Sequence, residues 1–190
     1  MLNTLKLAIL ALVVMHVRGN WFQKCGNLPT LPNFNAEKYL GLWYDIAHFD
    51  NAFTWFQKNG TCVTARYSLS DKPGHIVVKN SMQRDGKSKV AIADAYAPDE
   101  KYPSKLKVNF GSKLFEGNYH VIDTDYESYA MVYSCFSPLG IYKFEAAWIL
   151  GRKNNMDEDL KQSLIGKWES LGVDTTQFVY TSHKDCQYQE

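Results

Sequence analysis

The chain has 190 residues, 45% of them hydrophobic, and its 21 lysines and arginines nearly balance its 20 aspartates and glutamates. A chain of this length can form one domain with a core of its own, and there is no excess of positive charge that would indicate nucleic-acid binding. Tyrosine accounts for twelve residues, and aromatic residues make up 14% of the chain. Broad aromatic rings cover pleated surfaces well, so this composition favours a β-barrel or a β-sandwich.

Residues 1–19 are predicted to be a secretory signal peptide. Lys6 precedes an apolar run over residues 7–15, and residues 17–19 offer a cleavage site before Asn20. The run is too short to span a bilayer, and the alternative is a retained amphipathic anchor. We therefore expect a secreted, extracellular protein with no transmembrane segment and one domain over residues 20–190. Removing the signal takes away Lys6 and Arg18 and leaves 19 basic and 20 acidic residues, which predicts no electrostatic attraction to membranes or polyanions.

Four cysteines remain in the mature chain, at Cys25, Cys62, Cys135 and Cys186. An even number of cysteines in an exported protein predicts two disulfides, and four cysteines allow three pairings. Their spacing contains no C-x-x-C motif, which excludes a zinc or redox site of that kind.

The first strand is expected over Gly41–Phe49, after a short turn that Asn35 can cap. It opens with Gly41-Leu42-Trp43, a pattern typical of a buried aromatic residue where two backbones approach closely. The next connection, residues 50–60, carries three large aromatic residues, Phe53, Trp55 and Phe56. Loops are normally solvated, so these rings predict either a lid over something apolar or simple packing against a rim.

Asn59-Gly60-Thr61 is the only N-x-S/T sequence in the chain. In an exported protein it predicts glycosylation at Asn59, and an unused sequon in a tight hairpin is the alternative.

Further strands with alternating hydrophobicity are predicted at short, regular spacing, as in an antiparallel barrel or sandwich. They cover residues 62–70, 75–84, 90–96, 105–110, 117–123, 128–135 and 142–152. The alternation places Ile76, Val78, Asn80 and Met82 on one face of their strand. Ala91, Ala93 and Ala95 share a face of the following strand, and such small residues fit a tapering barrel interior.

One mature segment is predicted to be a helix, over residues 156–171. Its first turn is acidic, and an apolar stripe runs through Leu160, Leu164, Ile165, Trp168 and Leu171. The stripe must be buried, and the outside of the barrel is the available surface. A last short strand is expected over residues 177–181. The fold class is therefore all-β, with one C-terminal helix packed outside.

No catalytic motif is found in the sequence. There is no nucleophile elbow, phosphate-binding loop, dinucleotide fingerprint or zinc-protease motif. Histidines 48, 75, 120 and 183 are isolated in sequence, so each is predicted to be a surface or packing residue and no metal site is expected. All four cysteines are committed to disulfides, which leaves no thiolate nucleophile. We predict that the protein is not an enzyme and requires no cofactor.

Three stretches together resemble the conserved regions of the lipocalins. They are Tyr39-Leu40-Gly41-Leu42-Trp43-Tyr44, the run from Thr124-Asp125-Tyr126 to Cys135, and Arg152 at the end of a strand. The match covers nearly the whole mature chain and is most similar to the apolipoprotein D branch, whose relatives include insect bilin-binding proteins and crustacyanins. The resemblance implies an eight-stranded antiparallel up-and-down barrel that holds a small ligand.

The resemblance also implies roles for particular residues. It pairs Cys25 with Cys135 and Cys62 with Cys186, and it places Arg152 across the ring of Trp43 in a structural motif with Gly41, Thr124, Asp125 and Tyr126. It places the loop over residues 50–60 at the open end of the barrel. The residues expected to line the ligand cavity are Tyr67, Asn80, Arg84, Tyr119 and Trp148, with ordinary barrel filling as the alternative. Arg84 is expected to meet a ligand carboxylate near the rim.

The function implied is that of a secreted carrier for a fatty acid, sterol, retinoid or tetrapyrrole. Two alternatives stay open: a pigment protein that holds biliverdin or a carotenoid, and an interaction protein whose aromatic loop over residues 50–60 contacts a receptor, a lipoprotein or a membrane surface. The expected assembly is a monomer or weak dimer. The apolar connection Ser137-Pro138-Leu139-Gly140-Ile141 also flanks the presumed mouth and offers a second contact surface.

Overall fold

The computed structural model describes residues 24–51, 54, 56–111 and 116–188. The predicted signal peptide, Phe53 and Trp55 lie outside the described residues. Among the described residues, no helix has the length and apolar character that crossing a bilayer would take.

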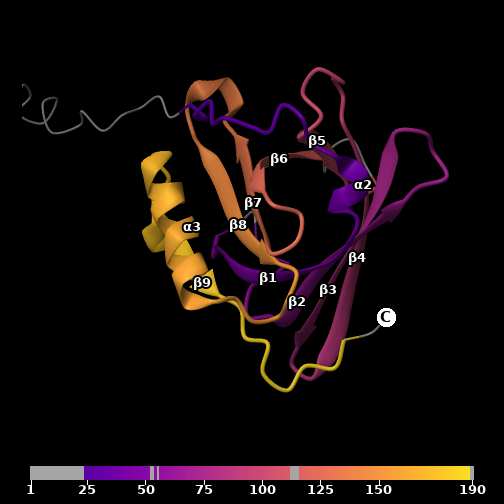
Figure 1. The fold of residues 1–190 in the computed structure, drawn as a ribbon, viewed down its shortest axis with the longest axis vertical. Coiled ribbons are helices and arrows are strands. Elements are labelled where there is room, and N and C mark those ends of the chain that lie inside the picture. Colours follow the sequence, from indigo (N-terminus) through magenta and orange to yellow (C-terminus); the bar gives the residue numbers. More distant parts are fainter. Residues whose placement is uncertain (1–23, 52–53, 55, 112–115, 189–190) are drawn as a thin grey trace, which may run out of the picture.

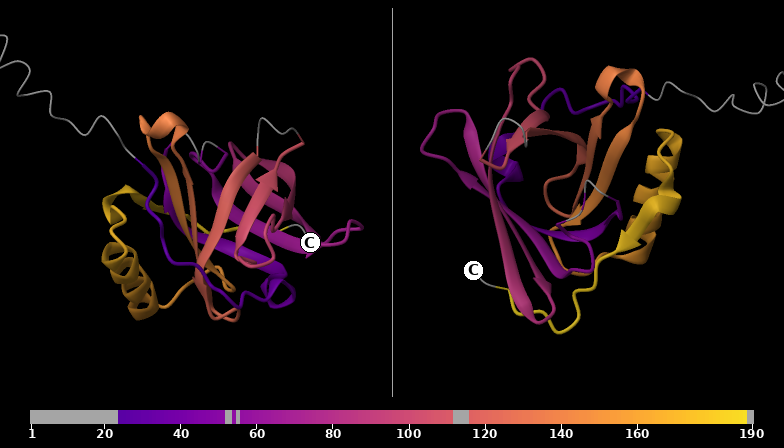
Figure 2. Two further views of the ribbon diagram at one scale, coloured as in Figure 1. Left: turned by 90° about the horizontal axis from the view of Figure 1, so that it is seen from above. Right: turned by 180° about the vertical axis from the view of Figure 1, so that it is seen from behind.

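Eight antiparallel strands form a closed barrel, as predicted (Figure 1). Each strand pairs with its neighbour in sequence, and β1 pairs with both β8 and β2, so the ring is complete (Figure 2). The strands are β1 (Gly41–Phe49), β2 (Thr61–Leu69), β3 (His75–Arg84), β4 (Lys87–Tyr96), β5 (Lys105–Asn109), β6 (Glu116–Thr124), β7 (Tyr129–Phe136) and β8 (Phe144–Gly151). A ninth strand, β9 (Phe178–Tyr180), pairs with the second half of β1.

The inner face of the barrel holds an apolar core. The predicted alternation is confirmed on β3 and β4, where Val78 lies opposite Ala93 and Ile76 opposite Ala95, all four of them buried in one cluster. Trp43 lies in the same cluster. Small alanines on β4 leave room for the large side chains that the other strands direct inward.

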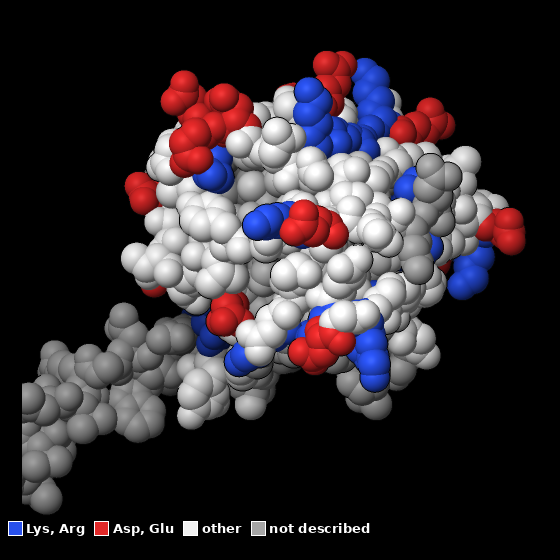
Figure 3. Space-filling view, turned by 90° about the horizontal axis from the view of Figure 1, so that it is seen from below, with Lys and Arg blue, Asp and Glu red and all other residues white. Residues whose placement is uncertain are grey.

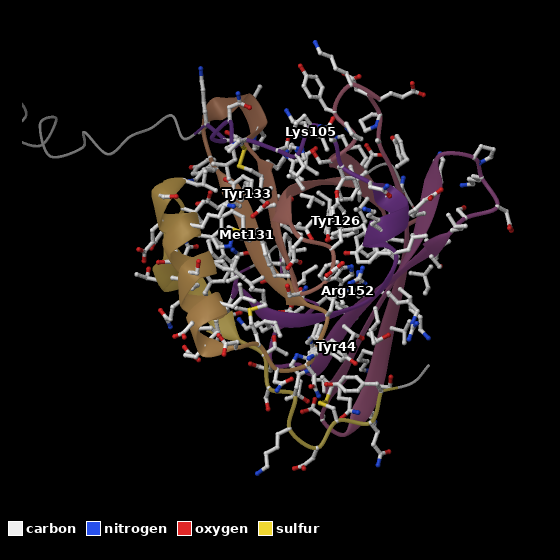
Figure 4. The ribbon with its side chains drawn as sticks, in the orientation of Figure 1. Tyr44, Lys105, Tyr126, Met131, Tyr133 and Arg152 are labelled. Atoms are coloured by element: carbon white, nitrogen blue, oxygen red, sulfur yellow. A yellow bond between two sulfur atoms is a disulfide. The ribbon has the colours of Figure 1, made fainter. Side chains whose placement is uncertain are left out.

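A second apolar cluster lies outside the barrel, beneath α3 (Glu158–Ser170). Leu164 and Trp168 of α3 are buried there against Met131 and Tyr133 of β7, whose side chains lie between the strand and the helix (Figure 4). The predicted helix is confirmed, but it begins at Glu158 rather than at residue 156. The reason is that the carboxylate of Asp157 caps it, accepting from the backbone N–H groups of the second and third residues that follow.

The remaining elements are short. α2 (Ala36–Tyr39) precedes β1 and is capped by Asn35, which accepts from the Lys38 N–H at 3.0 Å. Two single-turn 3₁₀ helices, η3 (Pro138–Gly140) and η4 (Thr175–Gln177), lie in the β7–β8 connection and before β9. β8 begins at Phe144, two residues later than expected, after the connection that contains η3.

Two disulfides join the terminal segments to the barrel. Cys25 is bonded to Cys135 and Cys62 to Cys186, which is the pairing that the resemblance implies. The bridges close sequence separations of 110 and 124 residues, and loops of that length make each bridge worth about 2–4 kcal/mol. The surface around this frame carries intermixed acidic and basic side chains on the face shown in Figure 3, in keeping with the balanced composition.

Candidate ligand-binding site

One end of the barrel is closed by Arg152, which follows β8. Its guanidinium lies 3.8 Å from the ring centroid of Trp43, a cation–π contact. Its three nitrogens donate to the carbonyls of Tyr126, Leu42 and Lys38 at 2.9, 3.0 and 2.9 Å. Figure 4 shows Arg152 and Tyr126 at this end. The arginine therefore joins the first strand, the β6–β7 turn and α2.

Gly41 is required at this closed end. Its φ of +96° is one that side chains rarely adopt, and a Cβ there would lie 3.2 Å from Nη1 of Arg152. Trp43 is fully buried, and its indole donates to the Tyr39 carbonyl at 2.8 Å. This end of the barrel is a packed plug.

The β6–β7 turn is held by the side chains of Thr124 and Asp125. One Asp125 oxygen accepts from the backbone N–H groups of Glu127, Ser128 and Tyr129 at 3.0, 2.8 and 3.0 Å. The Thr124 hydroxyl donates to the Tyr129 carbonyl at 2.5 Å. β7 begins one residue later than expected because the Ser128 N–H bonds to this carboxylate.

We expect Asp125→Ala to destabilise the protein by about 1 kcal/mol at neutral pH, as the loss of a capping carboxylate does. Partial burial disfavours the carboxylate, but the hydrogen bonds from Ser128, Tyr129 and Glu127 outweigh it and lower the pKa of Asp125. The stabilisation is therefore present above the ordinary carboxyl pKa and is lost as the pH falls through the lowered one. Urea denaturation should show a deficit in the free energy of unfolding that shrinks as the pH falls below the ordinary carboxyl pKa. A deficit independent of pH would contradict this role.

Three tyrosine hydroxyls meet on the inner side of the plug. Tyr119 OH lies 2.6 Å from Tyr67 OH and 2.9 Å from Tyr39 OH. Burial raises the pKa of Tyr67 to about 12, and burial also raises the pKa values of Tyr39 and Tyr119 well above the ordinary value. All three stay neutral at physiological pH and form a polar group in an apolar core. Tyr67 and Tyr119 were predicted for the cavity. Tyr39 was not predicted for the cavity, although it is the first residue of the stretch over residues 39–44 that resembles the lipocalins.

Trp148 lies on the inner wall of β8. Its ring stacks on Tyr119 with centroids 6.5 Å apart. Its indole N–H lies 3.1 Å from the Gln57 amide, in the amide orientation that also lets Gln57 donate to the Thr54 carbonyl. Asn80 is opposite Ala91 on the inner face of β3, and its side chain makes no hydrogen bond with any described residue. Trp148 and Asn80 thus lie on the inner faces of their strands.

Arg84, the last residue of β3, contacts the loop over residues 50–60. Its Nη2 donates to the Phe56 carbonyl at 2.6 Å. On the other side, Asn51 donates to the Glu145 carbonyl of β8 at 2.8 Å. Gly60 allows the turn to pack closely, since a Cβ there would lie 2.6 Å from the sulfur of Met82. The loop is therefore attached to both β3 and β8 at the open end.

Comparison with known proteins agrees with this geometry. The profile of the lipocalin-like domain family matches residues 34–183. The chain belongs to the lipocalin family. Apolipoprotein D of Mus musculus is 31% identical over 182 residues, which cover 95% of this chain and 94% of that protein. The Lazarillo protein of Schistocerca americana is 30% identical over 168 residues, covering 85% and 77% of the two chains.

Solved structures show the same fold. Insecticyanin from the tobacco hornworm Manduca sexta superposes with a TM-score of 0.73 at 24% identity, over 88% of this lipocalin and 92% of that chain. The H1 crustacyanin of the lobster Homarus americanus gives a TM-score of 0.70 at 24% identity, over 86% and 90% of the two chains. Together with apolipoprotein D, these neighbours fit the predicted branch of the family.

The histidines of this lipocalin differ in their surroundings. His75 lies 2.8 Å from Asp94 on the outer face of β3 and β4, and His183 bonds to Tyr188 in the C-terminal segment. His48 is buried beside Asp45, which the sequence did not reveal because the two belong to opposite faces of an unbroken strand. No cluster of three potential metal ligands occurs in the part of the chain that the structure describes.

Proposed function

We propose that this lipocalin is a secreted carrier that binds a small hydrophobic molecule inside its barrel. The observation that carries the proposal is a closed eight-stranded barrel plugged at one end, whose inner face combines apolar walls with a few polar groups. Those groups are the three tyrosine hydroxyls, Asn80 and the indole of Trp148. Binding removes apolar ligand surface from water at about 25 cal/mol per Å², and the polar groups fix the orientation.

The candidate ligands are a fatty acid, a sterol, a retinoid or a tetrapyrrole. A pigment protein that holds biliverdin or a carotenoid is the narrower alternative, supported by the branch of the family to which the sequence is most similar. An enzyme is not proposed, because nothing in the sequence or in the site points to a reaction. No cofactor is proposed to be required.

Contact with a partner is a second candidate function, favoured by exposed apolar residues around the β7–β8 connection. Leu139 is 90% exposed, Tyr142 67% and Phe136 54%. We propose that these side chains, together with the loop over residues 50–60, contact a receptor, a lipoprotein or a membrane.

Export and glycosylation complete the proposal. Asn59 is exposed in a turn with a φ of +56°, which suits an accessible sequon. The two disulfides fit an oxidising compartment. Secretion, removal of residues 1–19, and a monomer or weak dimer are proposed with them.

The test is mass spectrometry of an organic extract from natively purified protein. We expect a lipophilic molecule in stoichiometric amount, and a visible absorbance band if the ligand is a pigment. Delipidated protein should then rebind the same molecule with quenching of its tryptophan fluorescence. An empty extract, together with no quenching by fatty acids, sterols, retinol or biliverdin, would contradict the carrier function.

A further inference from the structure

The barrel wall contains a buried pair of ionisable residues, Asp45 and His48. They are 2% and 4% exposed, and His48 Nδ1 lies 3.2 Å from both carboxylate oxygens. A shift of register between Asp45 and Ala47 interrupts the alternation of β1. As a result Asp45 lies opposite Leu150 and His48 opposite Trp148, both of which pack with the interior cluster. The side chains of Asp45 and His48 therefore point toward the barrel interior, where the proposed ligand binds.

The hydrogen bonds of the pair leave one ring nitrogen available. Asp45 and Thr181 both lie at Nδ1 of His48, with the Thr181 hydroxyl also donating to Asp45 at 3.1 Å. No described residue bonds to Nε2 of His48. Because Asp45 holds the proton on Nδ1, Nε2 is the atom that can meet another partner. Oδ2 of Asp45 is also buried without a hydrogen bond.

The surroundings favour a cationic His48. Burial disfavours the imidazolium, but the hydrogen bond and charge of Asp45 and the charge of Asp50 outweigh it and raise the pKa of His48. The elements packed against the pair contribute Trp148 from β8 and Val179 and Thr181 from the C-terminal segment. The same segment brings one titratable side chain close, since Nε2 of His183 lies 2.8 Å from the carbonyl oxygen of Asp45. In the protonated state of His48, its Nε2–H is a charge-assisted donor inside an apolar wall.

The two arginines of the inner face each hold another part of the structure. Arg152 donates to three backbone carbonyls at the closed end. Arg84, the residue expected to meet a ligand carboxylate, donates to the Phe56 carbonyl in the loop over residues 50–60. His48 lies directly opposite Trp148 in the β1–β8 pair.

We propose that His48, oriented by Asp45, binds the carboxylate of a lipophilic acid whose apolar body lies against Trp148. The inference rests on the proposed function and narrows it, since a neutral sterol, a carotenoid or an alcohol would gain nothing from the charge. A raised pKa means that the imidazolium exists below that pKa and is lost above it, so affinity for the acid must fall as the pH rises.

The experiment compares two ligands with the same apolar chain, dodecanoate and dodecanol, by isothermal titration calorimetry on delipidated protein. Between about pH 6 and pH 8.5 the carboxyl of dodecanoate stays ionised, so its own titration does not interfere. We expect the affinity for dodecanoate to fall about fivefold to tenfold over this range, while that for dodecanol changes less than about twofold.

His48→Gln keeps a polar side chain but removes the charge, so it should abolish the pH dependence and leave dodecanol binding close to that of the unmodified protein. His75→Gln is the matched control, since it removes an equivalent histidine–aspartate pair on the outside of the barrel. The His75→Gln variant should retain the full pH dependence of the affinity for dodecanoate.

A second measurement does not depend on whether the variant folds. In NMR titrations of the unmodified protein, dodecanoate should raise the pKa of His48 and dodecanol should not. If both ligands bind with the same pH profile and the pKa of His48 does not respond, the carboxylate site is wrong while the carrier function stands. If neither ligand binds and no other lipophile does, the carrier function itself fails.

Discussion

Trp43→Ala is expected to lower the free energy of unfolding by about 3–5 kcal/mol, the usual cost of truncating a buried tryptophan. Trp43 is fully buried, carries the guanidinium of Arg152 on its face and donates from its indole to the Tyr39 carbonyl. Truncation of Trp43 leaves a cavity in the plug and removes the cation–π contact of Arg152. Urea denaturation followed by circular dichroism measures the loss.

The same variant should bind ligand almost as well as the unmodified protein when the measurement is made on the folded fraction. The reason is that Trp43 lies at the closed end, beneath the tyrosine hydroxyls. A loss of affinity as large as the loss of stability would show that the plug forms part of the cavity.

Trp148→Ala is expected to behave in the opposite way and to weaken ligand binding at least about tenfold, since a lost aromatic wall removes about 1.5–3 kcal/mol of contact. The side chain is only partly buried, so its truncation should destabilise the fold by less than the Trp43 truncation does. Calorimetric titration with dodecanol gives the affinity without any contribution from the charge of His48.

Trp148→Phe provides the control for this prediction. It keeps a flat apolar ring on the wall but removes the indole N–H that faces Gln57. Its affinity for dodecanol should be close to that of the unmodified protein and well above that of Trp148→Ala. If Trp148→Phe binds the ligand as weakly as Trp148→Ala, the hydrogen bond from the indole to Gln57 determines the affinity, and the aromatic ring does not.

The strands of the barrel were predictable because period-two alternation is a local property of the sequence. β3 shows this well, since its bounds and its inward residues agree with the expectation. The bounds of α3 and β7 were less accurate because the side chains of Asp157 and Asp125 capture backbone N–H groups at their starts. Such capture depends on geometry that a hydrophobic pattern does not contain.

The site was only partly predictable for a similar reason. The inward orientation of Tyr67, Tyr119 and Trp148 could be predicted from the alternation of residues along their strands. This alternation tells which face of the sheet a side chain lies on, but not which residues it contacts. The pairing of Asp45 with His48 depends on a bulge that brings residues three apart onto one face. The bond from Arg84 to Phe56 depends on the path of a loop, and no periodicity describes that path.

The pairing of β1 with β8 has a consequence for how the protein folds. The ring closes only when Gly41–Phe49 meets Phe144–Gly151, and both disulfides also join parts of the chain more than 100 residues apart. Contacts of such high sequence separation make folding slow, typically milliseconds to seconds for β-rich domains. During synthesis the first strand must therefore wait, with one edge unpaired, until nearly the entire barrel has left the ribosome.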